Sequence, residues 1–323
     1  MQGMICVAAI CVSAFCVPPV FAEQLSNDDV RDMFHTRGFC MGQTLSLDEI
    51  GRKFPSLAAA AEIAKLEFSG AFGPAVTAMS KKLEDIGSAK WDEAKQPMST
   101  FPNDKLNFAY VTEAQTKEFV TTVRQRAEGQ IEERTLQTLL MWNPTHRAHP
   151  ESEFVRYKRK CVTNVEGKSK GIKWQIEYPV SWASLEAERP NIVRKFVSER
   201  GRGSEYALVI VKALAPADRL TKREIDQAFS ATAIREFVPP GATFISGKRI
   251  SFDSLPGGMI TFSLAADRMG QQFKMRSLCY MTFFRDKVVM LQFSTTDDDA
   301  TFTRFEPLFR VMANSTVILS RYE

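Results

Sequence analysis

The chain has 323 residues, of which 44% are hydrophobic and 25% charged, and its formal net charge at pH 7 is +4. This composition is ordinary for a globular protein, and the charge is too small to indicate a nucleic-acid partner. Beyond residue 22 no segment is long and apolar enough to span a bilayer, so no transmembrane segment is expected in the mature chain.

The first 22 residues have the layout of a secretory signal peptide. They contain no Lys, Arg, Asp, Glu or His, and an apolar run over residues 4–17 ends at Pro18 and Pro19. Residues suited to cleavage follow as far as Ala22. The alternative is an uncleaved anchor helix, but the run is shorter than the roughly 20 residues that a spanning helix needs. We therefore predict cleavage after Ala22 and a periplasmic or secreted protein.

The chain that remains after cleavage is long for one compact domain. We predict a helical domain over residues 23–150 and a sheet domain over residues 151–323. The fold class expected is α+β, with a helical N-terminal region followed by an antiparallel sheet domain.

Apolar residues recur at helical spacing from residue 26 to about residue 142. Side chains that can cap a helix precede three of the apolar runs, at Ser26 or Asn27, at Ser46 and at Thr112. Gly38 is expected to stop the first helix, and Pro74 to interrupt an Ala-rich one. The region is therefore predicted to consist of several helices, including a long one that starts at Thr112.

Three cysteines follow the predicted cleavage site, namely Cys40, Cys161 and Cys279. An odd number in an oxidising compartment implies one disulfide and one thiol left over. Cys279 lies in an apolar strand-like run, where cysteine usually behaves as a small buried hydrophobe. By elimination we predict a disulfide between Cys40 and Cys161.

A basic stretch lies where the two predicted domains meet. It contains Arg156, Lys158, Arg159, Lys160, Lys168, Lys170 and Lys173, and Glu166 is its one acid. Such a stretch can bind an acidic partner or an anionic surface, or it can be a solvated linker. We take Lys158, Arg159 and Lys160 as candidate contacts with an unknown protein or anionic ligand.

From about residue 172 the pattern changes to alternation, which is typical of half-buried strands. Strands are predicted at 174–178, 192–197, 206–211, 243–252, 259–265, 273–284 and 288–295. Thr221 caps a helix among them, and Asp297–Asp299 opens a last helix that Pro307 should kink or divide. Short links between most strands indicate antiparallel pairing. Strand periodicity also puts Trp174 and Tyr178 on the core-facing side, with Trp182 packed just beyond the strand.

The strand that ends at Tyr178-Pro179, followed by Trp182, two strands, a helix, four strands and a closing helix, resembles the Mog1/PsbP-like superfamily. The resemblance covers about residues 172–320. It implies an antiparallel sheet flanked by helices on both faces, and a binding or assembly module without catalytic residues. We therefore expect a non-catalytic binding or assembly protein.

A thiol hydrolase is the competing hypothesis. Gly38-Phe39-Cys40-Met41-Gly42 has the spacing of a nucleophile elbow, and His146 or His149 could supply the base. An elbow needs a strand before the nucleophile, whereas the residues before Cys40 are helical in pattern. The hypothesis also requires a reduced thiol of low pKa.

Neither a metal nor another cofactor is predicted. His146 and His149 have a spacing that suits a metal, but two imidazoles need a further ligand, and the flanking prolines indicate a loop. Gly201-Arg202-Gly203 lacks the third glycine and the following helix of a dinucleotide loop. Asp297–Asp299 lacks the alternating ligands of a calcium loop.

Overall fold

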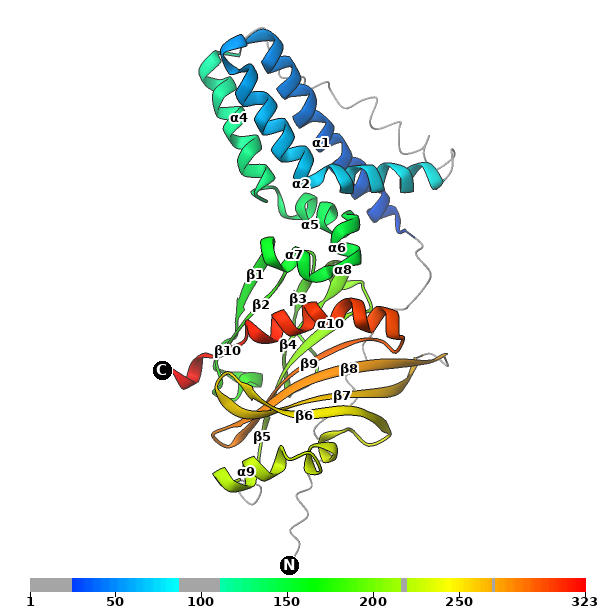
Figure 1. Ribbon diagram of the computed structural model, residues 1–323, viewed down its shortest axis with the longest axis vertical. Helices are drawn as coiled ribbons and strands as arrows, with labels where there is room; N and C mark the ends of the chain where they lie inside the picture. Colours follow the sequence, from blue (N-terminus) through cyan, green and yellow to red (C-terminus); the bar gives the residue numbers. More distant parts are fainter. Residues whose placement is uncertain (1–24, 87–110, 216–219, 269–270) are drawn as a thin grey trace, which may run out of the picture. The chain divides into compact units, whose positions relative to one another are not determined.

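The computed structural model describes residues 25–86, 111–215, 220–268 and 271–323, with the backbone alone for the described part of 266–272. The described chain divides into two compact units, a helical unit that ends at Ala148 and a sheet unit that begins at His149 (Figure 1). The predicted signal peptide lies outside the described residues.

The helical unit is built from helices packed side by side. They are α1 (Asn27–Lys53), α2 (Ala58–Asp85), α4 (Glu113–Ala127), α5 (Glu133–Trp142) and α6 (Pro144–Ala148), with a 3-10 turn, Pro55–Leu57, between the first two. The second helix, α2, packs along both α1 and α4, and α5 contacts α1 and α2. The side chains buried between them include Met33, Leu47, Ile50, Phe72, Met79 and Val123.

The predicted caps at Ser26 and Thr112 are confirmed, and both are capping boxes. The Ser26 hydroxyl accepts the Asp29 N–H, and the Asp29 carboxylate accepts the Ser26 N–H. Thr112 and Gln115 make the same exchange at the start of α4. Each box satisfies two N–H groups that a helix otherwise leaves without partners.

The predicted interruptions are wrong, because α1 continues through Gly38 and Ser46 and α2 continues through Pro74. Glycine within a helix costs about 1 kcal/mol and proline about 3 kcal/mol. Both helices bury apolar stripes on either side of these residues, and tertiary packing of such stripes dominates helix stability. Packing therefore outweighs the local breakers.

The sheet unit contains two antiparallel sheets. The smaller has the order β1-β2-β10, formed by β1 (Lys158–Val162), β2 (Trp174–Pro179) and β10 (Val317–Ile318). The larger has the order β3-β4-β5-β9-β8-β7-β6, formed by β3 (Ala183–Leu185), β4 (Ile192–Val197), β5 (Tyr206–Ala213), β6 (Ala242–Phe252), β7 (Leu255–Arg268), β8 (Gln271–Phe284) and β9 (Lys287–Thr296). The described helices of this unit are α7 (Pro150–Arg156), α8 (Ser198–Gly201), α9 (Lys222–Ala228) and α10 (Asp299–Asn314).

Hydrophobic cores lie on both faces of the large sheet. On one face, Phe309 and Met312 of α10 pack with the small sheet against β5, β8 and β9. On the other face, Phe229 and the 3-10 turn Ala233–Phe237 after α9 cover the sheet. The unit therefore has the predicted antiparallel sheet with helices on both faces (Figure 1).

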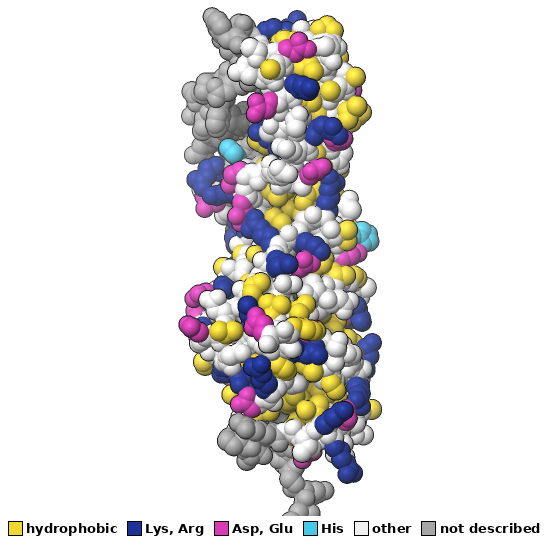
Figure 2. Space-filling view, turned by 90° about the vertical axis from the view of Figure 1, so that its left-hand side faces the viewer, with side chains coloured by type: hydrophobic (Ala, Val, Ile, Leu, Met, Phe, Trp, Pro, Cys, Tyr) yellow, Lys and Arg dark blue, Asp and Glu magenta, His cyan; other side chains and the backbone are white. Residues whose placement is uncertain are grey.

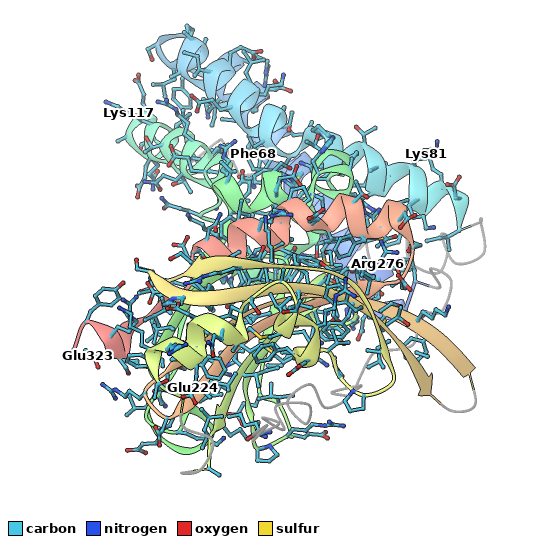
Figure 3. The ribbon with its side chains drawn as sticks, turned by 60° about the horizontal axis from the view of Figure 1, so that its bottom comes forward. Phe68, Lys81, Lys117, Glu224, Arg276 and Glu323 are labelled. Atoms are coloured by element: carbon cyan, nitrogen blue, oxygen red, sulfur yellow. The ribbon has the colours of Figure 1, made fainter. Side chains whose placement is uncertain are left out.

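The last helix begins at an ionic cluster. Asp298 is its N-cap and accepts the Thr301 N–H at 2.7 Å. Arg276 of β8, labelled in Figure 3, donates to Asp297 at 2.7 Å and to Asp299 at 2.8 Å. These bonds tie the sheet to the start of α10. Pro307 does not divide this helix, since α10 runs as one helix from Asp299 to Asn314.

The strands predicted from alternation are confirmed, as is the tryptophan core. Trp174, Tyr178 and Trp182 are 0%, 8% and 3% exposed, and all three belong to the core beneath α10. The short strands β1, β3 and β10 were not predicted from the sequence. One helix capped by Thr221 and reaching Phe237 was predicted from the sequence. The helix instead ends at Ala228, and a separate 3-10 turn follows it.

Replacing Trp182 tests this core. Trp182→Ala should lower the free energy of unfolding by about 3–5 kcal/mol, the usual cost of truncating a buried aromatic ring. Val155→Ala is the control, because Val155 is 77% exposed and should change stability by less than about 0.5 kcal/mol. Urea titration of both variants measures the difference. A loss below about 1 kcal/mol for Trp182→Ala would show that the ring is not part of the core.

Candidate functional site

The basic stretch is folded and is not a solvated linker. It contains strand β1 and the 3-10 turn Gly167–Ser169. Strand β1 pairs with β2 in an antiparallel register that sets Lys158 opposite Pro179 and Val162 opposite Gln175. The lysines are therefore held on an ordered element.

Several of its lysines hold the fold together. The Lys158 ammonium lies 2.7 Å from the Glu177 carboxylate, and the Lys173 ammonium lies 2.7 Å from that of Glu323. Lys170 donates to the carbonyls of Pro190 at 3.0 Å and Val211 at 3.1 Å. Burial lowers the pKa of Lys170, as does the nearby positive charge of Lys287. These cations are partly used inside the unit, which reduces the charge left for a partner.

The outer edge of β1 presents backbone groups that no described strand pairs with. The Val180 N–H donates to the Tyr157 carbonyl, and the Thr163 N–H donates to the Trp174 carbonyl. In an antiparallel pair, every second residue directs its N–H and C=O toward the neighbouring strand. Tyr157 and Thr163 do this toward β2, so Arg159 and Cys161 between them do it as well. The N–H and C=O groups of Lys158, Lys160 and Val162 therefore point away from β2. We call these three residues the basic edge.

Exposed side chains accompany this edge. Lys160 is exposed, and no acidic partner for its ammonium occurs among the described residues. Three valines are exposed here: Val162 on β1 (44%), Val155 before it (77%) and Val165 after it (43%). Figure 2 looks onto the side where β1 lies, and there Lys and Arg side chains lie among hydrophobic and acidic ones. The basic edge can thus offer backbone pairing, positive charge and apolar contact.

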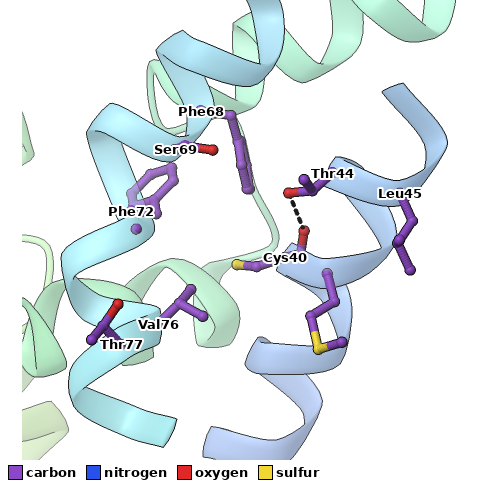
Figure 4. Close-up of a pocket in the computed structure, with 10 residues that line it drawn as sticks. Cys40, Thr44, Leu45, Phe68, Ser69, Phe72, Val76 and Thr77 are labelled. Atoms are coloured by element: carbon purple, nitrogen blue, oxygen red, sulfur yellow. Dashed lines mark hydrogen bonds between the residues drawn. The ribbon is translucent and has the colours of Figure 1, made fainter. Parts of the chain in front are cut away.

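Cys40 faces a groove of about 370 Å³ between α1 and α2 (Figure 4). Its walls include Met41, Leu45, Phe68 and Phe72. Burial raises the pKa of the Cys40 thiol to about 12, so the thiol is protonated at neutral pH. Among the described residues that line the groove there is no histidine. This geometry does not support the hydrolase hypothesis.

Cys40, Cys161 and Cys279, the cysteines among the described residues, form no disulfide in the structure. Cys40 is buried within the helical unit, Cys161 is half-buried on β1, and Cys279 is buried in β8, as expected. The disulfide between Cys40 and Cys161 is not formed here and stays a prediction.

Neither of the histidines proposed as bases lines the groove at Cys40. His146 lies in α6, and His149 precedes α7, 70% exposed, with its Nδ1 3.6 Å from the Glu151 carboxylate. Within the described ranges, no three His, Cys, Asp or Glu side chains are grouped as a metal would require. None of the helices in those ranges has the length and hydropathy to cross a membrane.

A buried glutamate, Glu153, joins α7 to the turn after β2. The Glu153 carboxylate is 5% exposed and accepts the Ser181 N–H at 2.8 Å and the Ser181 hydroxyl at 2.7 Å. Burial raises the pKa of Glu153 to about 7, although these hydrogen bonds and one from the Val180 N–H act in the opposite direction. The contact fixes the helix that immediately precedes β1.

Comparison with known proteins gives structural neighbours only. No known protein family matches the sequence, and no curated protein does. Cyanobacterial PsbP from Synechocystis sp. PCC 6803 is similar at 16% identity and a TM-score of 0.31, over 50% of this chain and 92% of that one. LpqN of Mycobacterium tuberculosis, described as involved in cell envelope biogenesis, is similar at 12% identity and a TM-score of 0.33, over 52% and 95%.

A Pseudomonas aeruginosa protein of unknown function, described as a putative regulator, has 17% identity and a TM-score of 0.23, over 42% of this chain and 85% of that one. These scores are too low to transfer a function. The sheet unit itself has the order of elements on which the resemblance to the Mog1/PsbP-like superfamily was based. Function has to be argued from the residues of this chain.

Glu153 makes stability depend on pH. Its pKa is about 7 in the folded state against an ordinary value of 4.5, so the folded state keeps a proton that the unfolded state releases between these pH values. Stability should therefore fall as pH rises from about 4.5 to 7, by on the order of 3 kcal/mol at most. Glu153→Gln, which retains an acceptor for the Ser181 N–H, should flatten this dependence in urea titrations.

The exposed Glu166 gives the control, since Glu166→Gln should leave the profile unchanged. An identical pH profile for the native chain and Glu153→Gln would show that Glu153 is not the group responsible.

Proposed function

We propose that this chain is a periplasmic or secreted binding or assembly protein without catalytic activity, and that its partner binds at the basic edge. The observation that carries the proposal is the set of outward backbone groups on β1, beside the exposed ammonium of Lys160. An extended segment rich in Asp and Glu fits such an edge. It would add a strand to the small sheet and place carboxylates near the lysines.

Edge lysines also have a purely protective role, because they prevent unwanted pairing of sheets between molecules. The two roles make different demands on the backbone of β1. A protective lysine needs only its charge, whereas a docked strand needs the outward N–H of Lys160 as well. A proline at this position removes that N–H and leaves the pairing of β1 with β2 intact, since proline is tolerated on the free side of an edge strand.

Site-specific photocrosslinking in the native envelope tests the proposal. A photoreactive phenylalanine analogue at Val162 should form a discrete protein adduct, because Val162 lies on the basic edge. The matched control is Ile245, which is 46% exposed on β6, the edge strand of the large sheet, and should not form it. The Val162 adduct should decrease at least about fivefold in Lys160→Pro or Lys160→Glu, and with added salt.

Three outcomes would contradict the proposal. They are no adduct at Val162, the same adduct at Ile245, or an adduct that persists in Lys160→Pro. Lys158 is kept native throughout, because its reversal would break the internal pair with Glu177.

A further inference from the structure

A second groove lies in the helical unit, between α1 and α4, and is independent of the basic edge. Its volume is about 320 Å³, within the range of small-molecule sites in proteins. Ile50 of α1 and Val111 and Phe119 beside or within α4 supply apolar wall. Thr116 and Thr122 also line it, and Thr116 uses its hydroxyl to bond the Thr112 carbonyl.

Among the described residues that line this groove, Arg126 is the one with a positive charge. The guanidinium carbon lies 5.4 Å from the centre of the Phe39 ring and 5.9 Å from that of Phe119. One nitrogen donates to the side-chain carbonyl of Gln43. These contacts fix the half-buried guanidinium between two rings, but they use few of its five N–H groups.

Arg126 differs from neighbouring arginines because no described carboxylate pairs with it. Arg124 contacts Glu67 at 2.8 Å, and Arg134 contacts Asp32 at 2.7 Å. The pKa of each of these two is raised by its acid, whereas burial lowers the pKa of Arg126. A partly desolvated cation without a counter-ion favours binding of an anion.

We propose that this groove binds a long-chain carboxylate, with its headgroup on Arg126 and its alkyl chain along Phe119, Val111 and Ile50. A planar guanidinium can bind one carboxylate through two parallel hydrogen bonds. The eleven-residue step from Gln115 to Arg126 corresponds to about 16 Å of helix, which gives an alkyl chain an extended wall.

Glu118 fixes the orientation of the ligand. It also lines the groove, eight residues before Arg126, which corresponds to about 12 Å along α4. Its negative charge repels a carboxylate at that end, and Arg126 attracts it at the other. The alkyl chain therefore lies toward Glu118 and the headgroup toward Arg126.

Calorimetric titration of the full chain with laurate, below its micellar concentration, tests the proposal. Laurate should bind, and Arg126→Gln should weaken its binding at least about tenfold, as expected for loss of a charge-assisted pair. Arg126→Lys should retain part of the affinity, because it keeps the charge. Arg124→Gln is the matched control on the same helix and should change affinity less than about twofold, since its exposed pair is with Glu67.

Dodecanol separates charge from apolar contact on the native protein, without any substitution. It should bind the native chain about as weakly as laurate binds Arg126→Gln. Glu118→Gln should bind laurate as tightly as the native chain or more tightly. Equal affinities for laurate and dodecanol, unchanged binding by Arg126→Gln, or no binding of laurate at all would overturn the proposal.

Discussion

Burial of both faces of the large sheet is the constraint on which the sheet unit depends. All residues of β5 from Tyr206 to Val211 are at most 7% exposed, and alternate residues belong to the two separate cores. An antiparallel sheet can leave one face in water, but this one is too apolar on both sides to do so. The chain therefore needs α10 and the small sheet on one face and α9 with its 3-10 turn on the other.

The position of the basic edge follows from that constraint. The small sheet contributes Trp174, Ile176 and Tyr178 of β2 to the core beneath α10. With β2 held by its side chains, β10 takes one of its edges and β1 takes the other. The outer edge of β1 is then left as the boundary of the small sheet. Packing thus determines which backbone groups the protein presents at this edge, and the lysine side chains add positive charge beside them.

Features encoded by neighbouring residues could be predicted from the sequence. Helix caps and long alternating strands depend on residues a few positions apart. The caps at Ser26, Thr112 and Thr221 and the strands were confirmed, whereas the cap predicted at Ser46 was wrong. Glycine and proline in these helices led to wrong predictions of helix ends. The free energy gained by burying α1 and α2 comes from contacts that are distant in sequence, and these cannot be seen locally. Strand β1 was missed for a related reason, since a short basic segment becomes a strand only through its pairing with β2.

The candidate sites were only partly predictable. Lys160 was found because charge runs are visible in a sequence, but the internal pair of Lys158 was not, since Glu177 is a partner on another strand. Arg126 carries no local signal at all. Only the folded structure shows that its neighbours from α1 are Phe39 and Gln43, neither of which carries a negative charge.

Residue-resolved hydrogen exchange of the backbone amides can test whether β1 is an ordered strand with an unpaired outer edge. Exchange should be slow at Arg159 and Cys161, which bond to β2, and fast at Lys158, Lys160 and Val162. Uniformly fast exchange along β1 would show that the strand is not formed. Slow exchange at Lys160 and Val162 in the isolated monomer would show that the edge is already covered. Either result would mean that the basic edge is not open to a partner strand.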